Sequence, residues 1–465
     1  MLHEDNQDPR PPHPPLAIAH LPTAAISHPR KSFYLSVRTK FILTFSVSIA
    51  WAVFSTMIAQ SWVTALSMDL GIVLAWLVVL SIAIIPGFMN AFLLSSLAMD
   101  NRPPRTSRLH YPGLSILVAA YNDQRTIVDT LESIARQSYP GDLDVLVVND
   151  GSSDNTAALV QELLPNYPWL RLVDLKTHVG KANALNRALP QVRHSLVATV
   201  DADSYLFGDA LTNIVERYVQ DPSNTRAVAG AVLVRNSRAT WITRAQEWEY
   251  FHGIACVKRM QSMYHGTMVA QGAFSVYHTK TLVELGGWPD CVGEDIVLSW
   301  SFLKNGYRIG YCEDALVFTN VPTTLSQLSK QRQRWSRGMI EAFKRHPGIL
   351  LKRRLSIVFV YWNLFFPLLD LIFTLAFLPG IVLALFGYFW IVGPITLVLI
   401  PMGMMMNYFM YRIGCRLFAQ NGLKVRFNIS GFFIYSLLFS IIMQPIALTG
   451  YFAELLNLRK TWGTK

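Results

Sequence analysis

Hydrophobic and polar positions divide the chain into two apolar blocks with one mixed block between them. Long apolar runs fill residues 41–99 and 355–453, whereas residues 100–350 alternate between short apolar and polar segments. About 20 consecutive apolar residues are enough for a helix to cross the hydrocarbon core of a bilayer. The pattern therefore predicts membrane-spanning helices on both sides of a water-exposed domain.

The apolar blocks predict about five membrane-spanning helices. Two lie within residues 39–99, and about three lie within residues 355–453. The first part of the second block, up to Tyr411, is long enough for two helices, divided either at Pro379–Gly380 or at Gly387–Gly393. Residues 429–452 form the fifth predicted helix.

The mixed block alternates strand-like and helix-like segments. The apolar runs LSILVAAY, LDVLVVND, LRLVDL and SLVATV have the length of buried strands, and TIVDTLESIARQS, TAALVQELLPNY and GKANALNRALPQV have helical periodicity. Near-continuous apolar strands that alternate with helices are typical of a parallel sheet covered on both faces. The expected fold class is therefore α/β, with a doubly wound, mostly parallel sheet inserted between transmembrane helices.

Polar residues follow three of the predicted strands. The segments are AAYND at 119–123, VVNDGSSDNT at 147–156 and DADS at 201–204. Ligands of such sheets bind outside the carboxyl ends of the strands, so the three segments are expected to meet at one site. The sequence contains no GxGxxG and no GxxxxGK[ST] motif, which argues against a dinucleotide fold and a P-loop.

The acidic residues of these segments suggest a nucleotide and a metal ion. Asp201 and Asp203 at positions i and i+2 of an extended segment leave on the same face, where their charges repel unless a positive group lies between them. Two such carboxylates suit Mg²⁺ that also binds a diphosphate. Asp150 can accept hydrogen bonds from a nucleobase or ribose, or it can instead form an Asx-turn or helix cap.

Two later segments add candidate chemistry. Glu294 and Asp295 start a predicted helix after the turn GGWPDCVG, where an acid can act as a general base or simply favour the helix N-terminus. The segment KQRQRWSRGMIEAFKRH at 330–346 is basic and amphipathic, as in helices on a membrane surface. In a functional reading, Arg334 pairs with a diphosphate and Trp335 stacks on a sugar ring.

Composition and charge agree with a membrane protein. The chain has 465 residues, of which 52% are hydrophobic and 15% charged, and its net charge is +11. Many basic residues flank the apolar blocks; they include Arg30, Lys31, Arg38 and Lys40 before the first block and Arg102, Arg105 and Arg108 after it. By the positive-inside rule the central domain is cytoplasmic. Arg459, Lys460 and Lys465 would then lie outside, so either the tail is an exception or the span count is off by one. The four cysteines lack CxxC spacing, which disfavours disulfides and zinc.

These patterns give six predicted segments in chain order. They are a disordered tail at 1–38, two transmembrane helices at 39–99, the α/β domain at 100–325, interfacial helices at 326–354, about three transmembrane helices at 355–453 and a C-terminal tail at 454–465.

The motifs AAYND, VVNDGSSDNT, DADS, GEDIVLSW and QRQRW follow one another in the order of the family 2 inverting glycosyltransferases, which the chain resembles. More narrowly it resembles the membrane-embedded processive synthases of cellulose, chitin, hyaluronan and poly-N-acetylglucosamine, of which a QxxRW motif is a mark. The poly-N-acetylglucosamine synthases are the most similar in form, because of GEDIVLSW and the following YCEDALVF.

The resemblance implies a GT-A-like domain and a role for each motif residue. Asp295 would be the catalytic base. The donor would be bound by Ala119, Tyr121, Asp123, Asp150, Lys181, Asp201 and Asp203, with Asp150 at the uridine and Asp203, with Asp201, at a Mg²⁺ or Mn²⁺ ion. Glu294, Gln331, Arg334 and Trp335 would bind the acceptor and pyrophosphate. The family commonly has Pro, Glu and Thr at positions 119, 123 and 293, where this chain has Ala119, Asp123 and Gly293.

The expected function is metal-dependent transfer of a sugar, expected to be N-acetylglucosamine, from a UDP-sugar to a growing β-linked polysaccharide. Export through a multi-pass plasma or inner membrane is expected to follow. The first alternative is a single-sugar transferase that acts on a lipid or polyprenyl phosphate. A transporter or receptor with a nucleotide-binding domain is the second, but it has no use for Asp295. The expected partners are the UDP-sugar, the polysaccharide and the bilayer, without nucleic acid, and a small accessory membrane subunit or a homo-oligomer stays open.

Overall fold

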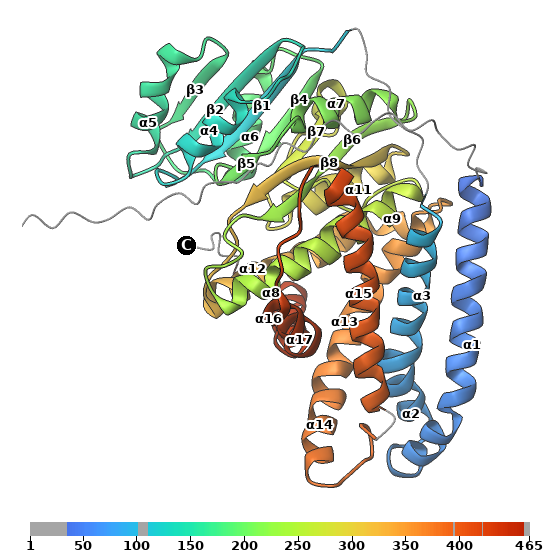
Figure 1. Ribbon diagram of the computed structural model, residues 1–465. Helices are drawn as coiled ribbons and strands as arrows, with labels where there is room; N and C mark the ends of the chain where they lie inside the picture. The colour runs from blue at the N-terminus through green and yellow to red at the C-terminus, as the bar shows by residue number, and fades with distance from the viewer. Residues whose placement is uncertain (1–34, 101–109, 394–395, 421, 460–465) are drawn as a thin grey trace, which may run out of the picture.

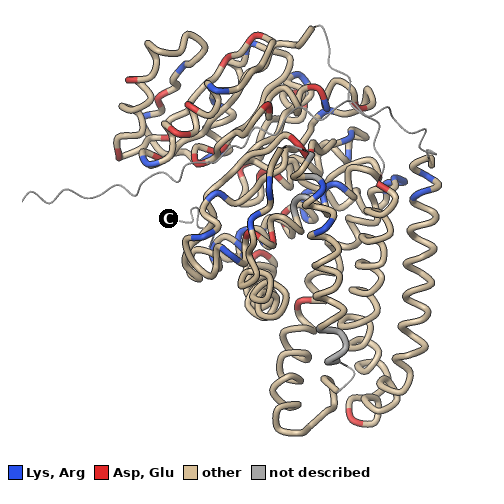
Figure 2. The backbone as a smooth tube through the Cα atoms, in the orientation of Figure 1, with Lys and Arg blue, Asp and Glu red and all other residues tan. Residues whose placement is uncertain are grey.

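An α/β domain lies at one end of a bundle of long helices (Figure 1). The computed structural model describes residues 35–100, 110–393, 396–420 and 422–459. Residues 1–34 of the tail predicted at 1–38 lie outside the described residues, and so do the basic residues Arg30, Lys31, Arg102, Arg105 and Arg108. Charged residues gather in the α/β domain and in the helices next to it, and the far half of the bundle carries almost none (Figure 2).

The α/β domain is built on one eight-stranded mixed sheet in the order β3-β2-β1-β4-β7-β6-β8-β5. The strands are β1 Leu114–Ala120, β2 Leu143–Asp150, β3 Leu170–Leu175, β4 Leu196–Val200, β5 Ser204–Leu206, β6 Thr225–Val234, β7 Phe274–His278 and β8 Arg308–Thr319. Strands β3, β2, β1 and β4 are parallel, as predicted. In the other half β7 runs antiparallel to β4 and β6, and β5 runs antiparallel to β8. Strands β6 and β8 are parallel to each other. The predicted α/β fold is confirmed, with a sheet that is wholly parallel in its first half and mixed in its second.

Both faces of the parallel half are buried. Neighbouring residues of β1 enter different clusters: Leu117 packs with Leu185 of α6, whereas Ile116 packs with Leu131 of α4, and all four side chains are almost fully buried. Successive strand residues point to opposite faces, so burial of both faces requires the continuous apolar strands of the sequence. The helices of this domain are α4 Ile127–Ala135, α5 Thr156–Leu163, α6 Lys181–Ala188, α7 Ala210–Gln220, α10 Thr279–Glu284 and α11 Glu294–Lys304, with short 3₁₀ segments at Leu164–Asn166 (η2) and Leu189–Gln191 (η3).

The bundle contains the longest helices. They are α1 Val37–Leu70; α2 Ile72–Val79, which continues through η1 Leu80–Ile84 into α3 Ile85–Ala98; α13 Ile357–Ile372, which continues through η6 Phe373–Phe377 into α14 Leu378–Leu385; and α15 Thr396–Gln420. Helix runs through Pro379–Gly380, so the break in this block falls at the second of the two predicted places. Among the described residues four helical stretches are long and apolar enough to cross a membrane: Val37–Leu70, Ile72–Ala98, Ile357–Leu385 and Ile429–Leu455.

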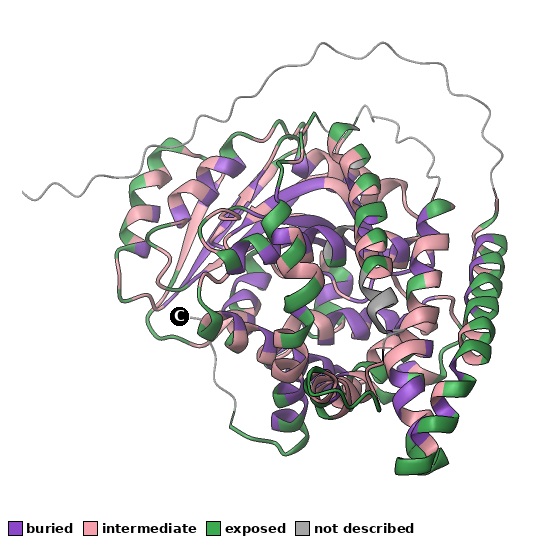
Figure 3. Cartoon of the chain, turned by 60° about the horizontal axis from the view of Figure 1, so that its bottom comes forward, coloured by how far each residue is buried: buried purple, intermediate pink, exposed green. Residues whose placement is uncertain are grey.

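The outer surface of the bundle is apolar. Much of α1 is exposed (Figure 3), and large apolar side chains such as Met57, at 69%, and Val73, at 77%, are largely uncovered. In water such a continuous apolar surface would mark an interaction site or an aggregation hazard. In a bilayer it contacts lipid, which agrees with the predicted membrane protein.

Shorter helices connect the bundle to the α/β domain. They are α8 Trp241–Glu249, which continues as η4 Tyr250–Val257 into α9 Lys258–Met263; α12 Leu325–Arg345 and η5 Pro347–Leu351; and the last helix, α16 Ile429–Phe433, η7 Ile434–Phe439 and α17 Ser440–Leu455.

The last helix packs lengthwise on α12. Gly450 allows the close approach, since a Cβ atom there would lie 2.6 Å from the carbonyl oxygen of Gln333. Further along, Arg337 contacts Glu454 at 3.3 Å and donates a hydrogen bond to the carbonyl oxygen of Leu458 at 2.6 Å. In Figure 1, α16 and α17 are seen nearly end-on, whereas α1, α3, α13 and α15 run side by side down the view. The described end of the chain therefore lies at the α/β domain and not at the far end of the bundle.

Candidate active site

Two of the predicted strand ends are joined by side-chain hydrogen bonds. The loop after β1 bonds to the loop after β2: the backbone N–H of Asn122 donates to Ser152 Oγ at 3.0 Å, and that of Asp123 donates to Thr156 Oγ1 at 2.8 Å. Ala119 lies in β1, opposite Val148 of β2. The two motifs, 30 residues apart in sequence, therefore form one edge of the site.

Asp150 ends β2 and is buried. Its carboxylate accepts hydrogen bonds from the backbone N–H groups of Val179, at 2.8 Å, and Gly180, at 2.9 Å, and lies 2.9 Å from His178 Nδ1. Hydrogen bonds to a charged group contribute about 1.5–3 kcal/mol each. In this structure Asp150 thus fixes the loop in front of α6 through a long-range contact, which is neither an Asx-turn nor a helix cap, and its role at the uridine stays a prediction.

An aromatic pair lies beside Asp150. The rings of Tyr121 and His178 stack with their centroids 4.0 Å apart and an interplanar angle of 27°. Tyr121 is 41% exposed, so part of this residue is accessible to a ligand. His178 could not be predicted from the sequence, because its partner Tyr121 is 57 residues away and a single His in a loop carries no local signal.

The DADS segment forms a turn and not the extended segment that we predicted. Strand β4 ends at Val200, and the backbone N–H of Ser204 then donates to the carbonyl oxygen of Asp201 at 3.0 Å. Lys181 Nζ forms an ion pair with the Asp201 carboxylate. The positive group that the repulsion called for is therefore, in part, a lysine of the chain itself.

The charges at this turn influence one another strongly. Burial would lower the pKa of Lys181, but Asp201, Glu294 and Asp295 more than offset it and raise the pKa above its usual range. Burial, Asp201 and Asp123 together raise the pKa of Asp203 to about 6. Asp123, at the first strand end, and Asp203, at the third, thus lie within electrostatic reach of each other, as the prediction of a single site requires.

The residues at this turn fit a divalent cation that is completed by a ligand. Within the described residues no three acidic, His or Cys side chains lie close enough together to hold a metal ion by themselves. The chain offers Asp203 and Asp201, and Mg²⁺ typically binds one or two carboxylates and takes its other oxygens from phosphates and water. A hard cation would also relieve the repulsion that raises the pKa of Asp203.

Glu294 and Asp295 begin α11, as predicted. One carboxylate oxygen of Asp295 accepts a hydrogen bond from the backbone N–H of Ile296 at 2.7 Å, and Glu294 lies 3.9 Å from Lys181 Nζ. Burial and the charge of Asp295 raise the pKa of Glu294 to about 7, although Lys181 and Arg334 oppose the shift. Two adjacent acids in unequal surroundings are the arrangement from which enzymes obtain one ionised carboxylate at neutral pH.

Lys258 is a buried lysine near this acid pair that the sequence analysis missed. It donates a hydrogen bond from Nζ to the carbonyl oxygen of Val269 at 2.8 Å. Burial lowers the pKa of Lys258 to about 7, against the attraction of Asp295. Its segment has the pattern of an ordinary amphipathic helix, so only the tertiary structure reveals that this residue lies within electrostatic reach of Asp295.

The change from Thr to Gly at position 293 has a packing reason. A Cβ atom at Gly293 would lie 2.4 Å from the Cα atom of Gly338 in α12, which is closer than real Cβ contacts come. The backbone N–H of Gly293 also donates to Glu341 Oε2 at 3.0 Å. The start of α11, and with it Asp295, is therefore fixed by backbone contact with the QxxRW helix.

The predicted residues of α12 face this site from the bundle side. Arg334 lies within electrostatic reach of Glu294 and of Tyr250. Gln331 has a buried side-chain oxygen without a hydrogen-bond partner among the described residues. Trp335 is 43% exposed, and its ring centroid lies 6.4 Å from that of Tyr250. An unsatisfied amide and a half-exposed aromatic ring together suit a sugar ligand.

Arg332 forms a cation–π contact with the ring of Trp335. Its guanidinium carbon lies 4.0 Å from the centroid of the Trp335 ring, and its side chain forms a buried ion pair with Glu249. Arg332 was not among the predicted site residues because it occupies an unspecified position of QxxRW. Its partner comes from α8, 83 residues earlier in the chain.

The comparisons with known proteins agree with the motifs. A domain family described as "Glycosyltransferase like family 2" matches residues 112–338. The chain is 34% identical over 274 residues to the poly-beta-1,6-N-acetyl-D-glucosamine synthase of Staphylococcus aureus (strain COL), which covers 56% of this chain and 66% of that protein. It is 36% identical over 234 residues to the protein of the same name from Staphylococcus epidermidis, which covers 50% of this chain and 56% of that protein. The aligned part is thus just under two thirds of the first relative and little more than half of the second.

A solved structure has a similar fold. A mannosyltransferase from Pyrobaculum calidifontis, determined in complex with GDP-Man and Mn²⁺, superimposes with a TM-score of 0.51 at 17% identity and covers 91% of this chain and all of that one. At this identity the likeness concerns the fold alone.

Proposed function

Residues 112–338 are a glycosyltransferase family 2 domain, as the motifs predicted, and from this premise we propose that the chain extends a β-linked polysaccharide. The donor is UDP-N-acetylglucosamine, and configuration at the anomeric carbon is inverted. The choice of sugar is supported by the two staphylococcal relatives and by GEDIVLSW and YCEDALVF.

The observation that carries this proposal is the mutual electrostatic reach of donor-side and acceptor-side groups. Lys181 contacts Asp201, lies 3.9 Å from Glu294 and is within the field of Asp295. Arg334 of α12 lies within electrostatic reach of Glu294. An inverting displacement requires a base on one side of the anomeric carbon and positive charge on the other, and these residues supply both.

In the proposed reaction the acceptor hydroxyl oxygen attacks the anomeric carbon while the bond to the UDP oxygen breaks. Asp295 takes the hydroxyl proton, and UDP departs with the bonding electron pair toward Lys181 and Arg334. A divalent cation, Mg²⁺ or Mn²⁺, held by Asp203 with Asp201 would supply further positive charge at the diphosphate. Tyr121 and His178 offer a stacking surface to the uracil ring, and Trp335 offers one to the acceptor sugar.

The proposal is tested with the full chain purified in detergent. UDP release and product size are followed with UDP-N-acetylglucosamine and with UDP-glucose, each with Mg²⁺, with Mn²⁺ and after removal of metal by chelation. We expect a polymer ladder from UDP-N-acetylglucosamine alone and loss of release on chelation. A single-sugar adduct would instead support the alternative transferase, and a ladder from UDP-glucose alone would contradict the proposed sugar.

We further infer an even number of membrane crossings with the C-terminus on the cytoplasmic side. Helices α1, α2–α3, α13–α14 and α15 run side by side, so we count α15 as a crossing although it is not among the four stretches named above. The last helix, which is among them, lies along α12 (Figure 1). This arrangement would put Arg459 beside the cytoplasmic domain and remove the conflict with the positive-inside rule.

A reporter fused to the C-terminus checks this topology. Green fluorescent protein placed there is expected to fluoresce and alkaline phosphatase to be inactive, because the former folds in the cytoplasm and the latter outside it. The matched control is the same pair of reporters inserted at Gly71, between α1 and α2, where the opposite result is expected. Active phosphatase at the C-terminus would show that the last helix crosses the membrane.

We also expect Arg332 to position Trp335 for the acceptor. Replacing Arg332 with Gln removes both the cation–π contact and the ion pair with Glu249, and cation–π contacts contribute about 0.5–2 kcal/mol. KM for a short oligosaccharide acceptor should rise about 3- to 30-fold, with little change in KM for the UDP-sugar. Arg332→Lys should keep KM for the acceptor close to the wild-type value. Gln333→Ala, one position away, serves as the control, and an equal rise in both KM values would argue for a merely structural role.

A further inference from the structure

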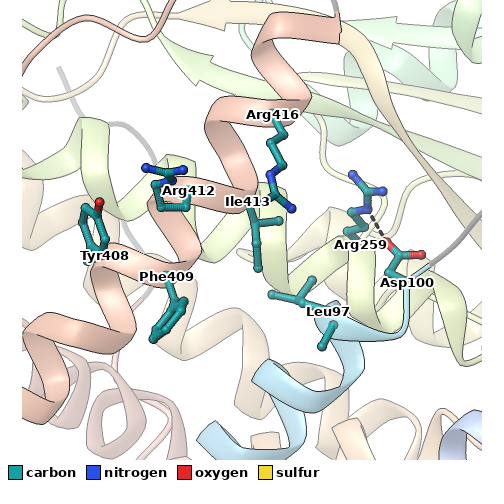
Figure 4. A pocket seen from close by; sticks show the side chains of 9 residues that line it. Leu97, Asp100, Arg259, Tyr408, Phe409, Arg412, Ile413 and Arg416 are labelled. Atoms are coloured by element: carbon teal, nitrogen blue, oxygen red, sulfur yellow. Dashed lines mark hydrogen bonds and ion pairs between the residues drawn. The ribbon is translucent and has the colours of Figure 1, made fainter.

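A cavity lies on the bundle, away from the site described above. It has a volume of about 680 Å³ and is lined by the end of α3, by Arg259 of α9 and by one face of α15 from Tyr408 to Arg416 (Figure 4). This position is where the bundle meets the α/β domain, at the level of the predicted cytoplasmic membrane surface.

The cavity carries an excess of positive charge. The cavity is lined by the guanidinium groups of Arg259, Arg412 and Arg416. Asp100 forms an ion pair with Arg259 and neutralises one of these three charges (Figure 4). Among the described side chains neither Arg412 nor Arg416 has an ion-pair or hydrogen-bond partner. The two lie one helical turn apart, where like charges destabilise a helix by about 0.2–0.5 kcal/mol. A bound anion would offset this repulsion.

The other part of the wall is apolar. Leu97, Phe409 and Ile413 line the same cavity, and along α15 the two arginines lie nearer the α/β domain than Phe409 does (Figure 4). Phe409 is 53% exposed and Met405, further along the helix, 54%, so the apolar wall continues onto the outer surface of the bundle. The order of charge and then hydrocarbon matches a phospholipid that stands in the inner leaflet.

We propose that this cavity binds the headgroup of an anionic phospholipid. Arg412 and Arg416 donate hydrogen bonds to the phosphate, since guanidinium groups pair with phosphate oxygens through two parallel N–H donors. The acyl chains follow Phe409 toward the bilayer. A free phosphate or nucleotide would leave the apolar wall without a partner, which is why a lipid is the favoured occupant. The site is separate from the transfer reaction and does not depend on the proposed donor sugar.

The test uses the full chain in nanodiscs of phosphatidylglycerol or phosphatidylcholine, with lipid retention followed by native mass spectrometry after release into detergent. We expect the wild type to retain phosphatidylglycerol selectively. The double variant Arg412→Gln/Arg416→Gln should retain about tenfold less phosphatidylglycerol, since two charge-assisted contacts are removed. The double variant Arg412→Lys/Arg416→Lys should keep part of it.

The matched control is Lys424→Gln/Arg426→Gln, which removes two exposed positive charges just after α15 and outside the cavity. It should retain phosphatidylglycerol as the wild type does, so a loss that depends only on net charge would overturn the site. Equal retention of both lipids by the wild type, or full retention by the Arg-to-Gln variant, would also overturn it. If inorganic phosphate displaces the lipid and stabilises the protein equally well, the site binds a free anion and the lipid proposal is wrong.

Discussion

Replacing Asp295 with Asn is expected to abolish sugar transfer and to leave UDP binding intact. Asn keeps the size of the side chain and the oxygen that accepts the hydrogen bond from Ile296 at 2.7 Å, so the start of α11 should not change. It cannot take a proton from the acceptor hydroxyl. Because general-base catalysis typically contributes about 10²–10⁴-fold, kcat should fall by at least that range.

We expect that Glu294, the neighbouring acid, does not replace Asp295 as the base. Glu294 lies 3.9 Å from the donor-side residue Lys181, and burial with the charge of Asp295 raises the pKa of Glu294 to about 7. Loss of the Asp295 charge removes one cause of that shift, so Glu294 becomes easier to ionise but stays turned toward Lys181. Asp295→Asn removes both the base and a negative charge. A loss of donor binding would appear in the affinity for UDP, which is measured separately.

The measurement combines the rate of UDP release with the affinity for UDP, both on purified protein. Asp290→Asn is the matched control, because Asp290 is an exposed acid in the turn before α11 and its loss should change neither quantity. If Asp295→Asn keeps more than about a tenth of the wild-type rate, another group removes the proton and the assigned base is wrong.

The parallel half of the fold could be predicted from the sequence because its signals are local. Strands such as LDVLVVND are continuous apolar runs, and the helices between them have their own periodicity, so each element is specified within about ten residues. The second half of the sheet depends on pairings between distant segments. Strand β6 bonds to β8, more than 70 residues later, and β7 enters antiparallel between β4 and β6. No local pattern encodes such neighbours.

The same distinction holds for the candidate site. Motif residues with an unusual local spacing, such as the acids of DADS or the pair Glu294–Asp295, were identified from the sequence. The turn that DADS forms in the structure could not be predicted from that spacing. The missed residues, His178, Lys258 and Arg332, are ordinary in their own segments. Each matters through a partner far away in the chain, namely Tyr121, Asp295 and Glu249 respectively. Long-range contacts of this kind follow from the fold and not from the motif.

The position of the last helix is a further case in which local pattern and tertiary contact differ. By length and composition Ile429–Leu455 could cross a membrane, and its apolar pattern does not indicate where it packs. A buried ion pair at its end, Arg337 with Glu454, fixes it to α12. Removal of one partner of a buried pair typically costs about 3–5 kcal/mol, because the other charge is left buried and unpaired, so loss of either residue should loosen the packing of this helix on α12. The QxxRW helix is thus clamped between α11 on one side and α17 on the other.

Arg334 is the second residue whose loss should have a large effect. Its guanidinium lies within electrostatic reach of Glu294 and Tyr250, at the boundary between donor-side and acceptor-side groups. Negative charge builds up on the diphosphate only as the bond to the anomeric carbon breaks. Because α12 holds the Arg334 guanidinium in place, its hydrogen bonds would stabilise the transition state more than they stabilise the bound UDP-sugar.

Arg334→Ala is accordingly expected to lower kcat by about 10²–10³-fold, the usual cost of removing one fixed donor to a developing anion, with a smaller change in KM. Arg334→Lys should recover only part of the rate, because an ammonium group supplies charge without the two parallel donors. Lys330→Ala is the control, since Lys330 is exposed one turn earlier on the same helix and leaves α12 otherwise unchanged. A loss confined to KM would mean that Arg334 holds the donor equally in both states, and Lys181 would then be the main positive group toward which the UDP departs.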